Sequence, residues 1–392
     1  MRAGASHPRR LAALALMAAS ALAPMRAAPA QATHAAPART AAQPASDFGA
    51  LVARLSDGGG YFDTDNLISN ESSYLHAVGR LRALRGAGPA GAYVGVGPDQ
   101  NFSYIAAVRP KVAFIVDIRR DNLLQHLLFK ALFALASTRV EYVALLVGRA
   151  APSELEPWRE RPIDEIVAHV DAAGPSAEAA QQARAAVLAK VRTFGVPLSE
   201  ADVATIGRFH GEFITNALDL RFTSHGRAPR PYYPTLRQLI LEKDASARRA
   251  SYLASEDDFR FLKGLQARDG VVPVVGDLGG AKALPAIAQW LGEKHLGVVA
   301  LYTSNVEYYL LRQGSFGRYA ESVKALPLAP GALLVRSYFG FGGAPMHPQA
   351  MPGYASVQTV HRIDDFLAEY AAGTLGTYED VVTRRVLDTR PR

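Results

Sequence analysis

The chain has 392 residues, of which 49% are hydrophobic, a formal net charge of +7 and no cysteine. This length and apolar content are sufficient for one large globular domain or two moderate ones. The missing cysteines exclude disulfides, cysteine-bound zinc and thiol nucleophiles. The positive charge favours anionic partners, but part of it lies in the first residues and the rest is scattered arginine. We therefore do not expect nucleic-acid binding.

The N-terminal segment has the pattern of an export signal. Three arginines among the first ten residues precede an uncharged run at 11–24, which is too short to span a bilayer, and residues 30–32 read A-Q-A, typical of a cleavage site. We interpret residues 1–32 as a signal peptide and residues 33–47 as a disordered linker. The alternative is a disordered extension. The protein is thus expected to be periplasmic or secreted, with no membrane span in its mature part.

Short apolar runs alternate with helical patterns in two parts of the chain. Residues 91–96 and 111–117 flank a helix-compatible stretch at 98–108, which predicts a βαβ unit. Further strand-like runs lie at 271–276, 296–302 and 332–338, and residues 354–370 add an edge strand and a helix. This alternation predicts an α/β protein with a Rossmann-like, doubly wound, mostly parallel sheet.

The sequence between these two parts is helical in pattern almost throughout. Residues 122–268 are interpreted as a large helical insertion between strands two and three, including a capping-box pattern at Ser199 to Asp202. The Rossmann-like domain then consists of residues 48–121 and 269–392. Either a lid that selects the substrate or additional core packing would explain such a block.

A glycine motif follows the first predicted strand. Residues 93–102 read Y-V-G-V-G-P-D-Q-N-F, and Gly95 and Gly97 would let the backbone turn and approach a ligand closely. Asp117 lies 20 residues beyond Gly97 at the end of the second strand, where a carboxylate can accept hydrogen bonds from ribose hydroxyls. Together they predict a nucleoside site, although a purely structural glycine turn remains the alternative.

The residue after the glycine pair indicates the kind of nucleoside. A dinucleotide fingerprint would have a third glycine in the first turn of the following helix, where this chain has Asp99, and a phosphate at the helix N-terminus. A carboxylate there repels a pyrophosphate but attracts the sulfonium and amino groups of S-adenosylmethionine. The motif therefore favours a cationic ligand.

This order of elements resembles the class I S-adenosylmethionine-dependent methyltransferases, and the runs at 95–102 and 116–120 also resemble a bacterial methyltransferase-like family of unknown function. The resemblance implies S-adenosylmethionine as the cofactor and places Asp277, after the third strand, near the adenine. It also places catalytic or substrate-facing residues after the fourth strand, where Ser304, Asn305 and Tyr308 are the candidates.

Two further groups complete the candidate site. Asn70 and Glu71 precede a helix and could either reach into the site or cap that helix. Arg119 could bind an anionic group or lie on a solvated face. The ten histidines are dispersed, so no metal site is expected. The candidate cofactor-binding residues are Gly95, Gly97, Asp99, Asn101, Asp117, Arg119, Asp277, Asn70 and Glu71.

These patterns support two hypotheses of function. The first is a methyltransferase that acts on a small molecule or an envelope component. The second is an exported, non-catalytic protein of the same fold that binds a nucleoside-like ligand or a protein partner. Ser304 and Asn305 carry no group strong enough to deprotonate a substrate by themselves, and export would separate the enzyme from a donor made inside cells. No motif specifies a methyl acceptor or an oligomeric state.

Overall fold

The computed structural model of the chain describes residues 47–85, 91–228, 230–340 and 346–390. The predicted signal peptide lies outside these residues, as does the predicted linker except for Asp47. That residue begins helix α1 (Asp47–Leu55), one residue before the predicted start of the Rossmann-like domain. Within the described ranges, no helix is long and apolar enough to cross a membrane.

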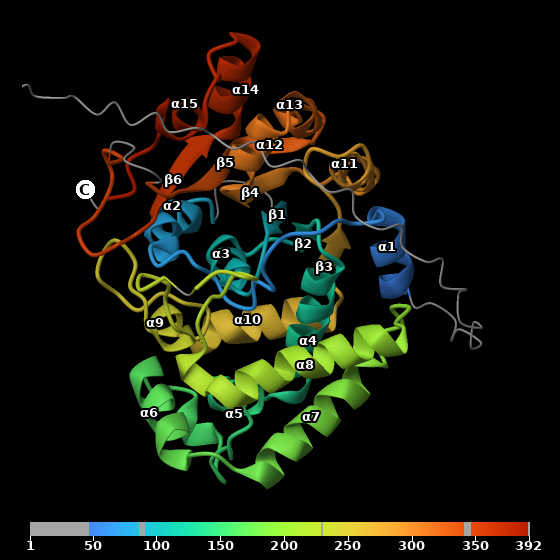
Figure 1. The fold of residues 1–392 in the computed structure, drawn as a ribbon, viewed down its shortest axis with the longest axis vertical. Coiled ribbons are helices and arrows are strands. Elements are labelled where there is room, and N and C mark those ends of the chain that lie inside the picture. Colours follow the sequence, from blue (N-terminus) through green and yellow to red (C-terminus); the bar gives the residue numbers. More distant parts are fainter. Residues whose placement is uncertain (1–46, 86–90, 229, 341–345, 391–392) are drawn as a thin grey trace, which may run out of the picture. The chain divides into compact units, whose positions relative to one another are not determined.

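The described residues form one six-stranded sheet in the order β3-β2-β1-β4-β5-β6 (Figure 1). Strands β1 to β5 pair in parallel, and β6 is antiparallel to β5. The strands are β1 (Ala92–Val96), β2 (Val112–Asp117), β3 (Val271–Val275), β4 (Val298–Ser304), β5 (Leu328–Tyr338) and β6 (Val357–Arg362). This mostly parallel α/β arrangement is compatible with the predicted Rossmann-like fold.

Burial explains why the apolar runs form these strands. All five residues of β1 and of β3 are buried, as expected for parallel strands covered on both faces. The prediction is least accurate for β5, which begins at Leu328 and not at residue 332. Pro330 and Gly331 interrupt the apolar pattern there, and Gly331 has a φ of +71°. The strand nevertheless continues through them, because Leu328 pairs with Val298 of β4.

Helices cover both faces of the sheet (Figure 1). The first part of the chain contributes the 3-10 helix η1 (Tyr74–Ala77), α2 (Val78–Arg82) and α3 (Gln100–Val108), and α14 (Ile363–Ala371) and α15 (Tyr378–Thr383) follow β6. Between β3 and β5 lie α11 (Ala283–Glu293), α12 (Val306–Arg312) and α13 (Phe316–Lys324). Every residue of α3 is buried, since α2 and α10 both pack on it. The turn that precedes α3 therefore leads directly into the protein core.

The chain between β2 and β3 is largely helical, as predicted. Its elements are α4 (Arg120–Leu135), α5 (Arg139–Val147), η2 (Glu156–Trp158), α6 (Ile163–Ala173), α7 (Ala177–Val191), α8 (Glu200–Asn216), η3 (Ala217–Asp219), α9 (Leu236–Ile240) and α10 (Glu256–Ala267). The capping box of α8 is confirmed: the Ser199 hydroxyl accepts from the Asp202 amide, and the Asp202 carboxylate accepts from the Ser199 amide. Helix α4 contacts β2 and β3 and also contacts α7 and α8. In Figure 1, α7 and α8 lie on the side of α4 that faces away from the sheet.

Candidate functional site

A cavity lies at the carboxyl edge of the sheet. The residues that follow β1, β2, β3 and β4 all line it, on both sides of the point between β1 and β4 where the strand order reverses. Open α/β sheets bind ligands at this position. The empty volume of the cavity is about 920 Å³ when the open solvent at its mouth is included. Of the described residues that line it, three carry carboxylates (Glu71, Asp117 and Asp277) and one carries a guanidinium (Arg119).

One wall comes from residues 56–71, which we call the strap. It crosses the ends of β2 and β3, because the Gly60 amide donates to the Ile118 carbonyl (2.6 Å) and the Asp57 amide to the Val275 carbonyl (2.9 Å). The strap brings Tyr61, Phe62 and Asn66 to the cavity. None of these was predicted, since nothing in the local sequence indicates that this segment turns back over the sheet.

Buried side chains hold the glycine turn by hydrogen bonds to its carbonyl groups. Gly97 lines the cavity with a φ of +81°, and its carbonyl accepts from Asn122 Nδ2 and His126 Nε2, both at 2.9 Å. Gly95 does not line the cavity; a Cβ there would lie 2.1 Å from Asn101 Oδ1. Asn101 in turn donates to the Val96 and Pro98 carbonyls, both at 2.8 Å. Gly95 and Asn101 therefore shape the turn.

Asp99 also lies outside the cavity lining. Its carboxylate accepts a hydrogen bond from the Tyr252 hydroxyl (3.2 Å), which comes from the chain between β2 and β3. Burial raises the pKa of Asp99 to about 6. The structure thus directs this side chain towards Tyr252, whereas the sequence placed it beside the ligand.

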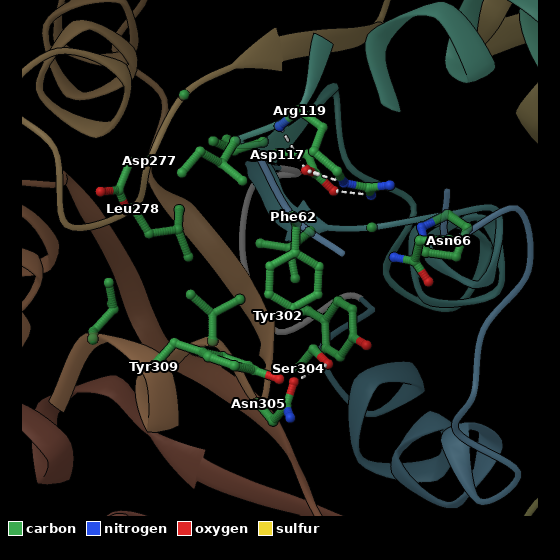
Figure 2. A pocket seen from close by; sticks show the side chains of 18 of the residues that line it. Phe62, Asn66, Asp117, Arg119, Asp277, Leu278, Tyr302, Ser304, Asn305 and Tyr309 are labelled. Atoms are coloured by element: carbon green, nitrogen blue, oxygen red, sulfur yellow. Dashed lines mark hydrogen bonds and ion pairs between the residues drawn. The ribbon is translucent and has the colours of Figure 1, made fainter. Parts of the chain in front are cut away.

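Asp117 and Arg119 line the cavity as one ion pair (Figure 2). Asp117 Oδ1 accepts from the Arg119 amide (2.9 Å) and Nε (3.0 Å), and Oδ2 accepts from Nη2 (2.7 Å). Arg119 Nη1 also donates to the Thr64 and Asp65 carbonyls, both at 2.7 Å. The pair ties β2 to the strap. A ribose would have to share the Asp117 carboxylate with Arg119, and Arg119 has a protein partner in place of an anionic ligand.

Asp277 occupies the far side of the cavity, next to Leu278 (Figure 2). It follows β3, and its Oδ1 accepts from the Gly279 amide at 2.9 Å, which fixes the turn between β3 and α11. The side chain is partly exposed. The structure therefore brings Asp277 to the same cavity as Asp117 and Gly97, in the order of the strands.

Glu71 is the most enclosed acid of the site. Its side chain lines the cavity, yet the residue is only 1% exposed. Four uncharged groups donate to its carboxylate: Gln100 Nε2 (3.0 Å), Gln358 Nε2 (2.5 Å), the Tyr302 hydroxyl (2.8 Å) and Ser304 Oγ (2.5 Å). Burial and the nearby Glu71 charge raise the pKa of Tyr302 well above its ordinary value, so that its hydroxyl keeps the proton it donates.

The residues after β4 fall into two groups. Ser304 and Asn305 line the cavity, and Ser304 has a φ of +53°, an unfavourable backbone conformation for serine. Tyr308 does not line it; its ring packs against Tyr378 and beneath Arg312. The neighbouring Tyr309 lines the cavity and packs edge-on against Phe62, with ring centroids 5.2 Å apart. The aromatic residue at the site is thus one position later than predicted.

A family profile described as "Domain of unknown function (DUF7790)" matches residues 67–158 and 220–381, well over half of the chain. The chain belongs to the DUF7790 family. No curated protein matches it in a sequence comparison. The match includes Glu71, Gly97, Asp117, Asp277 and Ser304 but neither the first part of the strap nor residues 159–219, which carry α6, α7 and α8.

The arrangement in this DUF7790 protein limits the chemistry of the cavity. An excess of carboxylates favours a ligand with positive charge and disfavours a polyphosphate. The described residues contain no group of three or more histidine and acidic side chains that could hold a metal ion. What the cavity offers is a row of acceptors from Asp277 to Glu71, with apolar and aromatic side chains between them.

Proposed function

We propose that the cavity binds S-adenosylmethionine and that the protein is a methyltransferase whose acceptor is unknown. The observation that carries this proposal is the set of groups along one cavity: Asp277 after β3, Asp117 at the end of β2, Gly97 after β1 and Ser304 at the end of β4. An adenosine laid along these groups would have its adenine near Asp277, its ribose near Asp117 and its charged tail near Gly97 and Glu71.

The charge of the lining supports a sulfonium ligand over a dinucleotide. Glu71, Asp117 and Asp277 outnumber Arg119, and Arg119 is already paired with Asp117. A pyrophosphate would meet like charge, whereas a sulfonium and an ammonium would meet opposite charge. Methyl transfer to a good nucleophile needs alignment more than proton transfer, so a rigid cavity with few strong acids or bases is sufficient.

Calorimetry on the full chain tests the proposal. We expect S-adenosylmethionine and S-adenosylhomocysteine to bind, and Asp117→Asn to weaken both, because the ribose hydroxyls would lose a charged acceptor. Asp121→Asn is the matched control, since Asp121 is close in sequence but does not line the cavity. If neither nucleoside binds to the unmutated protein, the proposal is wrong.

Binding without turnover is the second candidate function, and the Asp117–Arg119 pair favours it. A carboxylate that is held by three hydrogen bonds from Arg119 has less capacity for a ribose. We propose export from the pattern at residues 1–32, and an exported protein would retain at most the donor it carried. Labelled methyl donor distinguishes the two candidates: a methyltransferase transfers the label to an envelope extract, whereas a binding protein releases it unchanged. N-terminal sequencing of the expressed protein tests the export.

We also propose that the helices between β2 and β3 form an insertion that acts on the cavity through the strap. The Thr64 hydroxyl donates to the Thr223 carbonyl (2.6 Å), and the His225 amide donates to the Asp63 carbonyl (2.8 Å). Arg208 of α8 also pairs with Asp65 at 2.7 Å. A lid function predicts that Arg208→Ala changes ligand on- and off-rates; additional core packing predicts a change in stability alone.

A further inference from the structure

The two ends of the cavity differ in how their carboxylates are balanced. Asp117 faces a guanidinium, whereas all four groups that donate to Glu71 are uncharged amides and hydroxyls. Gln100 Nε2 and Gln358 Nε2 can only donate, so Glu71 is held as an acceptor. A buried carboxylate is usually paired with a cation because its desolvation is costly.

Ser304 connects the Glu71 carboxylate to the cavity through a hydrogen bond. Ser304 Oγ lies 2.5 Å from Glu71 Oε1 and 3.4 Å from Asn305 Oδ1. With its single proton directed to the nearer Glu71, the lone pairs of Oγ can accept from a ligand. Ser304 takes this position at the end of β4 with an unfavourable φ of +53°, which its surroundings must impose. Ser304, Asn305 and Glu71 all line the cavity, so a ligand here would meet hydrogen-bond acceptors beside a carboxylate.

We propose that Glu71, acting through Ser304, makes the β4 end of the cavity a subsite for a positively charged group of the ligand. The inference rests on the proposed function and identifies the sulfonium centre, or an ammonium in its place, as the group recognised. Glu71 is a specificity-determining and positioning residue. It separates the charged donor from its neutral thioether product, which favours product release after methyl transfer.

Two nucleosides that differ at the sulfur test this directly. S-adenosylmethionine carries a sulfonium, and S-adenosylhomocysteine has the same adenosine and amino-acid groups around a neutral sulfur. At a site with little screening, one unpaired carboxylate predicts that the charged ligand binds about tenfold more tightly or better. Calorimetry at constant ionic strength measures this ratio on the unmutated full chain.

Variants test whether Glu71 causes the difference in affinity between the two nucleosides. Glu71→Gln keeps the shape of the side chain and should remove most of the roughly tenfold preference for the sulfonium, with a smaller change in the affinity for the thioether. Asp277→Asn is the matched control at the other end of the cavity, and it should weaken both ligands by the same factor. Ser304→Ala removes the acceptor but not the charge and should give an intermediate ratio. A structural role for Glu71 alone would change both affinities together.

The outcomes separate the two proposals. If both nucleosides bind equally to the unmutated protein, or if Glu71→Gln leaves the ratio unchanged, the subsite inference is wrong and the proposed function stands. If neither binds, both are wrong. Should Glu71→Gln fail to fold, as judged by thermal unfolding, the ratio measured on the unmutated protein and on Ser304→Ala still decides the matter.

Discussion

The Asp117 end and the Glu71 end of the cavity use a carboxylate in opposite ways. Asp117 and Arg119 neutralise each other, and the remaining donors of Arg119 hold the strap through the Thr64 and Asp65 carbonyls. Glu71 lies in a network of uncharged side chains from α3, β4 and β6, and it brings a negative charge with it.

This difference separates framework from recognition. Removing either partner of a buried ion pair destabilises the folded protein, but the intact pair presents little net charge to a ligand. A carboxylate with neutral donors presents its whole charge. We therefore expect loss of Arg119 to act mainly on stability, and changes at the Glu71 end to act mainly on the selectivity between charged and neutral ligands.

The largest expected effect comes from Arg119→Ala. The substitution leaves the Asp117 carboxylate without its cation in a nearly buried position, with 11% of the side chain exposed, and it releases two strap carbonyls. We expect a loss of about 3–5 kcal/mol in the free energy of unfolding, measured by urea denaturation.

Arg192→Ala is the control for this prediction. Arg192 is 53% exposed and pairs with Glu200, which is 85% exposed. Surface pairs contribute about 0–1 kcal/mol, so the control should unfold near the midpoint of the unmutated protein. Equal losses in the two variants would contradict a framework role for the Asp117–Arg119 pair.

The second prediction concerns pH and two residues that brace the glycine turn between the two ends. Burial raises the pKa of Asp99 from 3.8 to about 6, so between these values the folded state keeps a proton that the unfolded state has lost. Stability from Asp99 therefore increases as the pH falls from 6 to 4. Burial lowers the pKa of His126 from 6.5 to about 4, so the unfolded state binds the extra proton and stability from His126 decreases over the same window.

These two contributions oppose each other, and single substitutions should reveal them. Asp99→Asn removes the Asp99 contribution, so relative to the unmutated protein we expect stability to fall by up to about 3 kcal/mol as the pH falls from 6 to 4. His126→Gln keeps a donor for the Gly97 carbonyl and removes the His126 contribution, so we expect a relative rise of similar size as the pH falls from 6.5 to 4. Urea midpoints at half-unit pH steps measure both. Profiles parallel to that of the unmutated protein would contradict the assignment.

The sequence predicts the framework of the site well, because short-range patterns determine it. Each parallel strand ends at the same edge of the sheet, so the acids after β2 and β3 and the glycine turn after β1 had to lie close together. Asp117, Gly97 and Asp277 do line one cavity. The helical pattern between β2 and β3 and the capping box at Ser199 are local features of the same kind.

What the sequence does not predict depends on the path of the chain in space. Glu71 and Ser304 are 233 residues apart and meet only because the strap crosses the sheet edge. Tyr308 and Tyr309 are adjacent on a helix, where successive side chains point in directions about 100° apart, so a pattern cannot tell which one faces the cavity. Gly95 fits a ligand-contact pattern, but the group it makes room for is Asn101.

The smallest effects are expected at the glycine turn. They test whether Gly95 only shapes the turn while Gly97 also contacts the ligand. Gly95→Ala would place a methyl group 2.1 Å from Asn101 Oδ1, and such overpacking costs about 1–3 kcal/mol of stability. Gly97→Ala would force a side chain to a φ of +81°, at about 1–2 kcal/mol, and would add a methyl group beside the cavity.

We therefore expect both variants to be less stable but only Gly97→Ala to lose more nucleoside affinity than its stability loss explains, as measured by thermal unfolding and calorimetry together. Gly292→Ala is the matched control, because a Cβ at this position of α11 would meet nothing within 4 Å. It should be neutral or stabilising by up to about 1 kcal/mol. If Gly95→Ala weakened binding as strongly as Gly97→Ala at similar stability, the glycine nearer the strand would also contact the ligand, and the division between framework and recognition would not hold at this turn.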